Sequence, residues 1–125
     1  MQKVFLVEDS PPVLDRLISL LGALPNTQIV GHASGAEAAT RGILAARPDL
    51  VVLDLRLAQG TGFDVLLELH GKATGIDVYV LSSFSYAPYR RQAEQLGALA
   101  FFDKSTDMER LRDAVAKRGA DYNGA

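Results

Sequence analysis

The 125-residue chain contains no cysteine and carries 13 basic and 15 acidic side chains, a formal charge of -2 at pH 7. This length fits one domain that buries roughly two thirds of its unfolded surface. The 48% of hydrophobic residues are enough to fill its core. Without cysteine, disulfides, thiol catalysis and thiolate metal sites are excluded, and two histidines do not favour a zinc site. The near-neutral charge argues against direct binding of nucleic acid.

The apolar segments of the chain are all short. The longest uninterrupted run, residues 98–102, is far below the roughly 20 residues that a membrane-spanning helix needs. Near the start, the apolar run 4–7 stops at Glu8 and Asp9, so it is too short for the hydrophobic stretch of a secretion signal. We therefore expect a cytoplasmic protein that does not interact with a membrane.

Short apolar or β-branched runs alternate with segments of helical periodicity along the whole chain. The runs predict buried strands, in chain order, at residues 3–7, 28–33, 50–53, 77–81 and 99–102. The periodic segments predict one helix after each strand. The first has an apolar face that spans residues 13–24, and the others lie at residues 35–46, 63–70, 86–97 and about 106–119. Strands and helices that alternate in this way are typical of a parallel sheet with helical crossovers.

The ends of several helices carry recognisable signals. Ser10 is expected to cap the first helix, and Ser34 and Glu37 have the spacing of a capping box for the second. Gly71 and Gly119 are expected to end the third and fifth helices. We therefore predict a three-layer, doubly wound α/β domain over residues 1–119, followed by a flexible tail at residues 120–125.

Polar residues stand at the ends of four of the five predicted strands. In a doubly wound sheet, ligands bind at the carboxyl ends of the strands, where the winding direction reverses. Any one of these side chains alone is also typical of a turn, a cap or a solvated surface, but their occurrence together on one rim favours a shared site. The residues are Glu8, Asp9, Asp54, Ser82, Ser83 and Lys104.

Three carboxylates on one rim repel each other unless a cation enters. Mg²⁺ is the natural cation, because it binds oxygen ligands and is usually held by one or two carboxylates together with phosphate oxygens. The ammonium of Lys104 and the hydroxyl of Ser82 would then bind phosphoryl oxygens. The pattern therefore predicts a magnesium site that a phosphoryl group completes.

These residues, in their order and spacing, resemble those of response-regulator receiver domains over nearly the whole chain, from residue 4 to about residue 118. The matching pieces are the pair Glu8 and Asp9, the segment VVLDL with Asp54, Gly62, Ser82 in VLSS, and LGALAFFDK ending in Lys104. The resemblance implies a two-component signal-transduction phosphoprotein with the flavodoxin-like strand order 2-1-3-4-5.

The resemblance also implies the chemistry of the site. Asp54 would be the phosphoacceptor, and Lys104 would pair with the phosphoryl group. Ser82 would move to bond a phosphoryl oxygen, and the rotamer of Phe101, three residues before Lys104, would follow it as an aromatic switch. The Mg²⁺ ligands would be Glu8, Asp9, Asp54 and the backbone carbonyl of Arg56.

Two departures from the usual pattern concern the lifetime of the phosphoryl group. Arg56 and Phe84 stand at positions that line the route of the hydrolytic water in receiver domains. A guanidinium and a bulky ring there should hinder attack by water, which predicts slow autodephosphorylation. The alternative is that both are surface side chains without kinetic effect.

The function implied is a phosphoacceptor switch of a phosphorelay. Its donor would be a sensor histidine kinase, a histidine phosphotransfer protein or a small donor such as acetyl phosphate. Its output would be a conformational change in the fourth helix, fifth strand and fifth helix that an unknown target protein reads. Beyond Mg²⁺-dependent self-phosphorylation and autodephosphorylation, no enzymatic activity is expected. Whether the fourth and fifth helices form a homodimer stays open.

Three other functions compete with this interpretation. One is a pseudo-receiver, an interaction module that never takes phosphate. Another is a phosphatase with an aspartyl nucleophile, which would want an acid where Arg56 stands. Flavin binding is suggested only by analogy of fold.

Overall fold

The computed structural model describes residues 1–72 and 74–124. Within them, five parallel strands form one sheet in the order β2-β1-β3-β4-β5, so the predicted fold class is confirmed. The strands are β1 (Gln2–Val7), β2 (Thr27–Ala33), β3 (Leu50–Leu53), β4 (Asp77–Ser82) and β5 (Ala100–Asp103). The helices are α1 (Pro11–Gly22), α2 (Ala36–Ala46), α3 (Gly62–Gly71), α4 (Ala87–Gln95) and α5 (Met108–Gly124).

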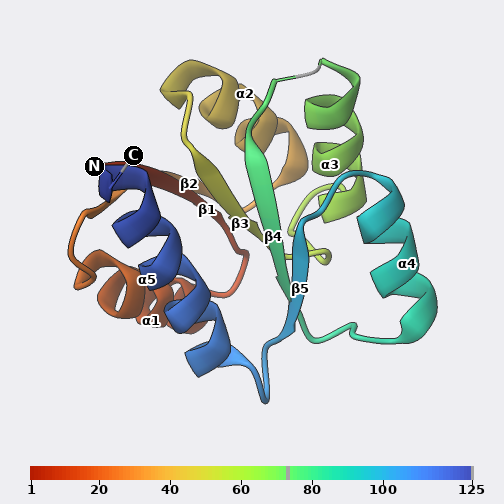
Figure 1. The fold of residues 1–125 in the computed structure, drawn as a ribbon. Coiled ribbons are helices and arrows are strands. Elements are labelled where there is room, and N and C mark those ends of the chain that lie inside the picture. Colours follow the sequence, from red (N-terminus) through yellow and green to blue (C-terminus); the bar gives the residue numbers. More distant parts are fainter. Residues whose placement is uncertain (73, 125) are drawn as a thin grey trace.

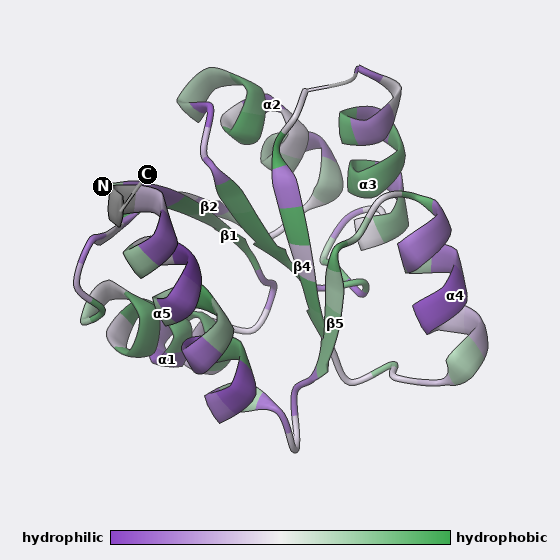
Figure 2. Ribbon diagram, in the orientation of Figure 1, coloured by the Kyte–Doolittle hydropathy of each residue, from purple (hydrophilic) through white to green (hydrophobic). Residues whose placement is uncertain are grey.

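Helices cover both faces of the sheet (Figure 1). Successive side chains of a strand point to opposite faces, so each buried strand supplies two cores. Phe5 and Val7 of β1 pack in the core under α2, α3 and α4, whereas Val4 and Leu6 pack in the core under α1 and α5. Figure 2 shows the strands as mostly hydrophobic, whereas α4 and much of α5 are hydrophilic.

The direction of winding reverses beside β1. This strand pairs with β2 on one side and with β3 on the other. The connections that leave the carboxyl ends of β1 and β3 therefore run toward opposite faces of the sheet, which opens a crevice between them. The candidate site lies in that crevice.

The capping box predicted for α2 is wrong. The helix begins after Gly35, and its first N–H groups bond to Gln59 of the loop after β3. The Ala36 N–H donates to the Gln59 backbone oxygen at 2.7 Å, and the Glu37 N–H donates to its side-chain oxygen at 3.1 Å. A residue distant in the sequence thus satisfies the donors that Ser34 was expected to satisfy.

The predicted end of the last helix at Gly119 is also wrong. Helix α5 continues to Gly124, through most of the expected tail, and Ala125 lies outside the described residues. A Cβ atom at Gly119 would lie 3.1 Å from the Thr27 hydroxyl and 3.2 Å from the Gln2 amide nitrogen. The glycine therefore permits the close approach of α5 to β1 and β2, and it does not end the helix.

Candidate active site

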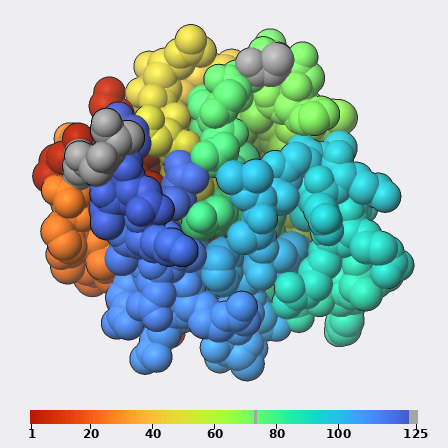
Figure 3. All heavy atoms as spheres, viewed as in Figure 1, coloured from red at the N-terminus to blue at the C-terminus, as the bar shows by residue number. Residues whose placement is uncertain are grey.

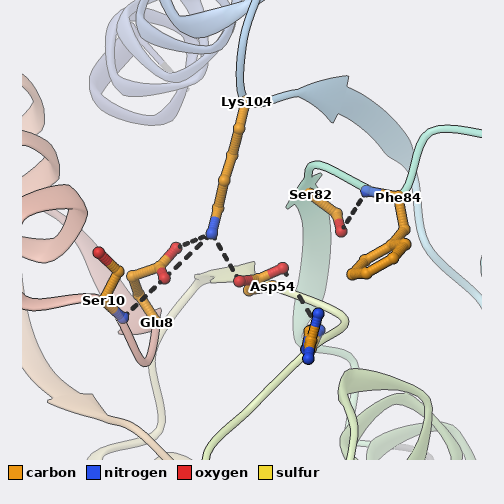
Figure 4. Close-up of polar contacts among 7 residues, drawn as sticks. Glu8, Ser10, Asp54, Ser82, Phe84 and Lys104 are labelled. Carbon is orange, nitrogen blue, oxygen red and sulfur yellow. Dashed lines mark hydrogen bonds and ion pairs between the residues drawn. The ribbon is translucent and has the colours of Figure 1, made fainter.

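The ends of four parallel strands bring the predicted site residues together. Glu8 and Asp9 follow β1, Asp54 follows β3, Ser82 is the last residue of β4, and Lys104 follows β5. Figure 4 shows Lys104 extending from the end of β5 toward the carboxylates of Glu8 and Asp54.

The ammonium of Lys104 joins the two buried carboxylates. Its Nζ lies 2.6 Å from Asp54 Oδ2 and 2.8 Å from Glu8 Oε1. The side chains of Glu8 and Asp54 are 1% and 4% exposed, against 16% for Lys104. Two carboxylates removed from water to this extent need a nearby cation, and Lys104 supplies it.

Glu8 is fixed further by the start of α1. The Ser10 N–H donates to Glu8 Oε2 at 3.0 Å. Ser10 is the N-cap residue of α1, as predicted, but its side chain makes no capping hydrogen bond to any residue that the structure describes. Its backbone is therefore the part of Ser10 that serves the site, by orienting a carboxylate.

Burial and pairing act in opposite directions on these charges. Burial raises the pKa of Glu8 above its ordinary value of 4.5, and the hydrogen bonds from Lys104 and Ser10 offset this only partly. Burial opposes the charge of Lys104, but the hydrogen bonds to Asp54 and Glu8, together with the negative charges of these two groups, outweigh it and raise its pKa above 10.5. Lys104 is therefore a cation at neutral pH.

The acidic residues form a cluster that could hold a metal ion. Glu8, Asp9 and Asp54 each offer a carboxylate oxygen, and these oxygens all lie within 4.8 Å of one another. The set consists of hard oxygen donors, and with Lys104 it carries three negative charges against one positive charge. A divalent, oxygen-binding cation such as Mg²⁺ fits this donor set and this charge.

Ser82 is fully buried beside the cluster. Its Oγ accepts a hydrogen bond from the Phe84 N–H at 3.1 Å (Figure 4). The hydroxyl is thus tied to the loop that leads from β4 into α4. Movement of the Ser82 hydroxyl toward a phosphoryl group, as the resemblance implies, would either break this hydrogen bond or move the loop with it.

A cavity of about 190 Å³ opens above Asp54. Arg56 and Phe84 stand together at this cavity, with the guanidinium carbon 5.7 Å from the centre of the ring. The Arg56 N–H also donates a long hydrogen bond of 3.4 Å to Asp54 Oδ1. The lining residues are Asp9, Asp54, Arg56, Ser83, Phe84 and Lys104.

Packing explains why position 62, one of the positions that resemble receiver domains, is a glycine. It is the first residue of α3, and its N–H donates to the Leu55 backbone oxygen at 2.8 Å. A Cβ atom there would overlap the Asp54 carbonyl oxygen and crowd Leu55 Cα. Only glycine lets α3 begin this close to the end of β3, which holds the backbone of Asp54 in place.

Phe101 is partly buried against the core under α4. Phe102 packs in the opposite core, as the alternation of the strand predicts. Arg90 of α4 also contacts Phe101, and the sequence pattern did not indicate this contact. Its guanidinium carbon lies 4.6 Å from the centre of the Phe101 ring. This contact joins different elements, so helical periodicity alone gives no signal for it.

The fold and the site have the architecture of a receiver module of two-component signal transduction: a doubly wound sheet with acidic residues and a lysine at its strand ends. The chain belongs to the response regulator receiver domain family, whose profile matches residues 4–116. None of the helices in the described part of the chain is long and apolar enough to cross a membrane.

Several curated proteins are similar to this chain. The DNA-binding transcriptional activator DevR/DosR of Mycobacterium tuberculosis is 35% identical over 120 residues, covering 96% of this chain and 55% of that protein. The uncharacterized transcriptional regulatory protein YvfU of Bacillus subtilis is 30% identical, covering 94% of this chain and 58% of that protein. The chain thus spans little more than half of these relatives.

Solved structures show the same fold. The signal receiver domain of the putative response regulator NarL from Mycobacterium tuberculosis matches with a TM-score of 0.84 and 25% identity, over 96% of this chain and 94% of that one. A LuxR-family DNA-binding response regulator from Staphylococcus aureus matches with a TM-score of 0.87 and 22% identity, over 95% and 99%.

Proposed function

We propose that this chain is the phosphoacceptor switch of a two-component phosphorelay and that Asp54 takes the phosphoryl group in a Mg²⁺-dependent reaction. The observation that carries the proposal is the contact of Lys104 with Asp54 beside the Glu8, Asp9 and Asp54 cluster. The donor is a sensor histidine kinase, a histidine phosphotransfer protein or a small acyl phosphate. No activity on other substrates is proposed.

Phosphoryl transfer to Asp54 is an in-line displacement. A carboxylate oxygen of Asp54 forms a bond to phosphorus, and the bond from phosphorus to the donor atom breaks, with its electron pair leaving on the donor. The Asp54 Oδ2 atom is held by Lys104 at 2.6 Å, whereas Oδ1, among the residues that the structure describes, accepts only the 3.4 Å bond from Arg56. Oδ1 is therefore the freer nucleophile, and the product is an acyl phosphate.

The charges of the site suit the reaction. The ammonium of Lys104 lies beside the attacking carboxylate, where it can neutralise the charge of the incoming phosphoryl oxygens. Glu8, Asp9, Asp54 and the Arg56 carbonyl would hold Mg²⁺, which supplies further positive charge to those oxygens.

The signal would leave through α4, β5 and α5. Ala93 is the buried residue of α4, and Tyr89 adds a ring contact with Phe63 of α3. Figure 2 shows most of the rest of the helix as hydrophilic, so its apolar face is narrow. In Figure 3, α4 and α5 flank β5 on the viewed face, where they form one continuous surface. A new bond from Ser82 to the phosphoryl group would shift the α4 loop and Phe101, and a target protein or a second copy of the chain would bind the altered surface.

The direct test is the intact mass after incubation with acetyl phosphate and Mg²⁺. We expect one phosphoryl adduct in the wild type and in Asp15→Asn, an exposed carboxylate of α1. The adduct should be absent from Asp54→Asn and from samples treated with EDTA. An adduct that persists in Asp54→Asn would overturn the proposal. No adduct from acetyl phosphate or from phosphorylated kinases would favour a binding module that does not use phosphate.

Arg56 and Phe84 would set the lifetime of the acyl phosphate. Their contact partly covers the cavity above Asp54, so water should reach the phosphoryl group slowly. We expect Arg56→Asn combined with Phe84→Glu to shorten the lifetime several-fold, measured by decay of the adduct mass. An unchanged lifetime would mean that Arg56 and Phe84 are surface side chains that do not affect the rate of hydrolysis.

A further inference from the structure

Arg90 makes three contacts with the elements that would carry the signal. Its Nε donates to the Ser85 backbone oxygen at 2.8 Å, and its Nη1 donates to the Phe101 backbone oxygen at 3.4 Å. The guanidinium carbon also lies over the Phe101 ring, 4.6 Å from its centre. One side chain of α4 thus joins the loop after β4 to strand β5.

The position of these contacts connects them to the site. Ser85 stands three residues after Ser82, and the Phe84 N–H between them donates to the Ser82 hydroxyl. Phe101 stands three residues before Lys104, which binds Asp54. Arg90 therefore holds the two segments that lead directly to the phosphoryl-binding side chains.

Other contacts of α4 come from the buried Ala93 and from Tyr89, whose ring centre lies 6.3 Å from that of Phe63 in α3. The ring of Phe101 is only partly buried. A partly buried guanidinium that donates to two carbonyl groups and lies over an aromatic ring makes a comparatively strong set of contacts. Among the described residues of α4, Arg90 is the one whose side chain both hydrogen-bonds to β5 and packs over one of its rings.

We propose that Arg90 is a positioning residue that holds the phosphate-free arrangement of the β4–α4 loop and Phe101. If Ser82 leaves Phe84 for a phosphoryl oxygen, the Phe84 N–H loses its partner unless the loop that Arg90 fixes through Ser85 also moves. Loss of these contacts raises the population of the phosphoryl-binding arrangement. This inference rests on the proposed function, because the phosphoryl-binding arrangement is the one that phosphorylation of Asp54 would stabilise.

The test is a titration with beryllofluoride, a phosphoryl mimic, in the presence of Mg²⁺, followed through backbone amide NMR signals. A ligand that binds a sparsely populated state gains apparent affinity in proportion to that population. Arg90→Gln should therefore bind beryllofluoride about 3 to 10-fold more tightly than the wild type. Arg91→Gln, a change at the exposed neighbour on the same helix, should leave the affinity unchanged.

Two further measurements separate positioning from a general structural role. Without beryllofluoride, Arg90→Gln should increase amide hydrogen exchange in the β4–α4 loop and β5 and leave β1 and β3 unchanged. Arg90→Lys, which keeps a cation but lacks the Nε–H, should fall between wild type and Arg90→Gln in both measurements. Wild-type affinity in Arg90→Gln would overturn the inference alone. Failure of every variant and the wild type to bind beryllofluoride would overturn the proposed function together with it.

Discussion

The two ends of the sheet both hold ion pairs between partly buried side chains, but the cation meets one carboxylate at the amino end and two at the carboxyl end. There, Arg118 of α5 donates from Nε to the Gln2 side-chain oxygen at 3.0 Å and from Nη1 to Asp77 Oδ2 at 2.8 Å. The amide nitrogen of the buried Gln2 donates in turn to the Val115 backbone oxygen at 3.1 Å. One cation meets one carboxylate, and the neutral amide is satisfied on both sides.

The carboxyl end is different. Lys104 meets Glu8 and Asp54, and Asp9 adds a third, exposed carboxylate within 4.8 Å of both. Folding thus assembles more negative charge than it neutralises, which costs stability and is retained where a ligand uses it. The two ends therefore differ in the number of carboxylates that share one cation, and the proposed site lies at the end where this number is larger.

The first prediction compares the two ends of the sheet by the space that they leave for a side chain. Helix α3 begins at one end of the sheet and ends near the other, and it has a glycine at each of its own ends. Gly62, its first residue, has no room for a methyl group, whereas nothing lies within 4 Å of a Cβ atom at Gly71, its last. We expect Gly62→Ala to lower the free energy of unfolding by about 3 kcal/mol and Gly71→Ala to change it by less than about 0.5 kcal/mol, measured in urea. Equal losses would show that the tight fit at Asp54 is not a constraint.

The second prediction breaks the balanced end. Arg118→Met leaves Asp77 without its cation and Gln2 Oε1 without its donor. We expect the free energy of unfolding to fall by about 2 kcal/mol, and not more, because water can still solvate the partly exposed Asp77. Phosphorylation by acetyl phosphate should persist under conditions where the variant is folded. Arg112→Met, which removes an exposed contact with the adjacent Asp113, is the matched control and should cost less than about 0.5 kcal/mol. Loss of phosphorylation in folded Arg118→Met would mean that the two ends are coupled.

The sequence predicted the gathering of the site and the fold for a simple reason. The strands are buried runs of apolar residues, so their ends could be located, and the ends of parallel strands meet at one edge. Glu8, Asp54 and Lys104, separated by up to 96 residues, are in contact for this reason. The roles of Asp54 and Ser82 followed from a resemblance and stay predictions.

What could not be predicted depends on contacts between distant segments. Gln59, and not the adjacent Ser34, accepts hydrogen bonds from the N–H groups at the start of α2. Inside α5, position 119 is a glycine because Thr27 and Gln2 leave little room for a side chain there. Arg90 looks like a solvated residue on a helical wheel, yet it packs over a ring of another element. Local signals such as capping spacing or a glycine do not encode these neighbours, which tertiary packing supplies.

The third prediction removes the excess charge of the carboxyl end. Asp9→Asn relieves repulsion among the carboxylates without taking a partner from Lys104, so the metal-free variant should be about 0.5 to 1 kcal/mol more stable than the wild type. Mg²⁺ should raise the unfolding temperature of the wild type, because it binds the folded state, and should raise that of the variant less. Asp15→Asn serves as the control and should respond to Mg²⁺ like the wild type. A variant that is less stable without metal would contradict the idea of unbalanced charge.

The smallest expected effect concerns the pH dependence of the same end in EDTA. Burial raises the pKa of Glu8 in the folded state above its ordinary value of 4.5. Between pH 4.5 and this raised pKa, the folded state therefore binds a proton that the unfolded state does not. The ionised Glu8 therefore costs stability at neutral pH, and this cost disappears as the pH falls through the raised pKa toward 4.5. Relative to Glu8→Gln, which has no such proton, the wild type should gain free energy of unfolding over this range, as followed by urea unfolding at successive pH values. The opposite slope would mean that the contact with Lys104 outweighs burial, and the carboxyl end would then resemble the balanced pair of Arg118 and Asp77.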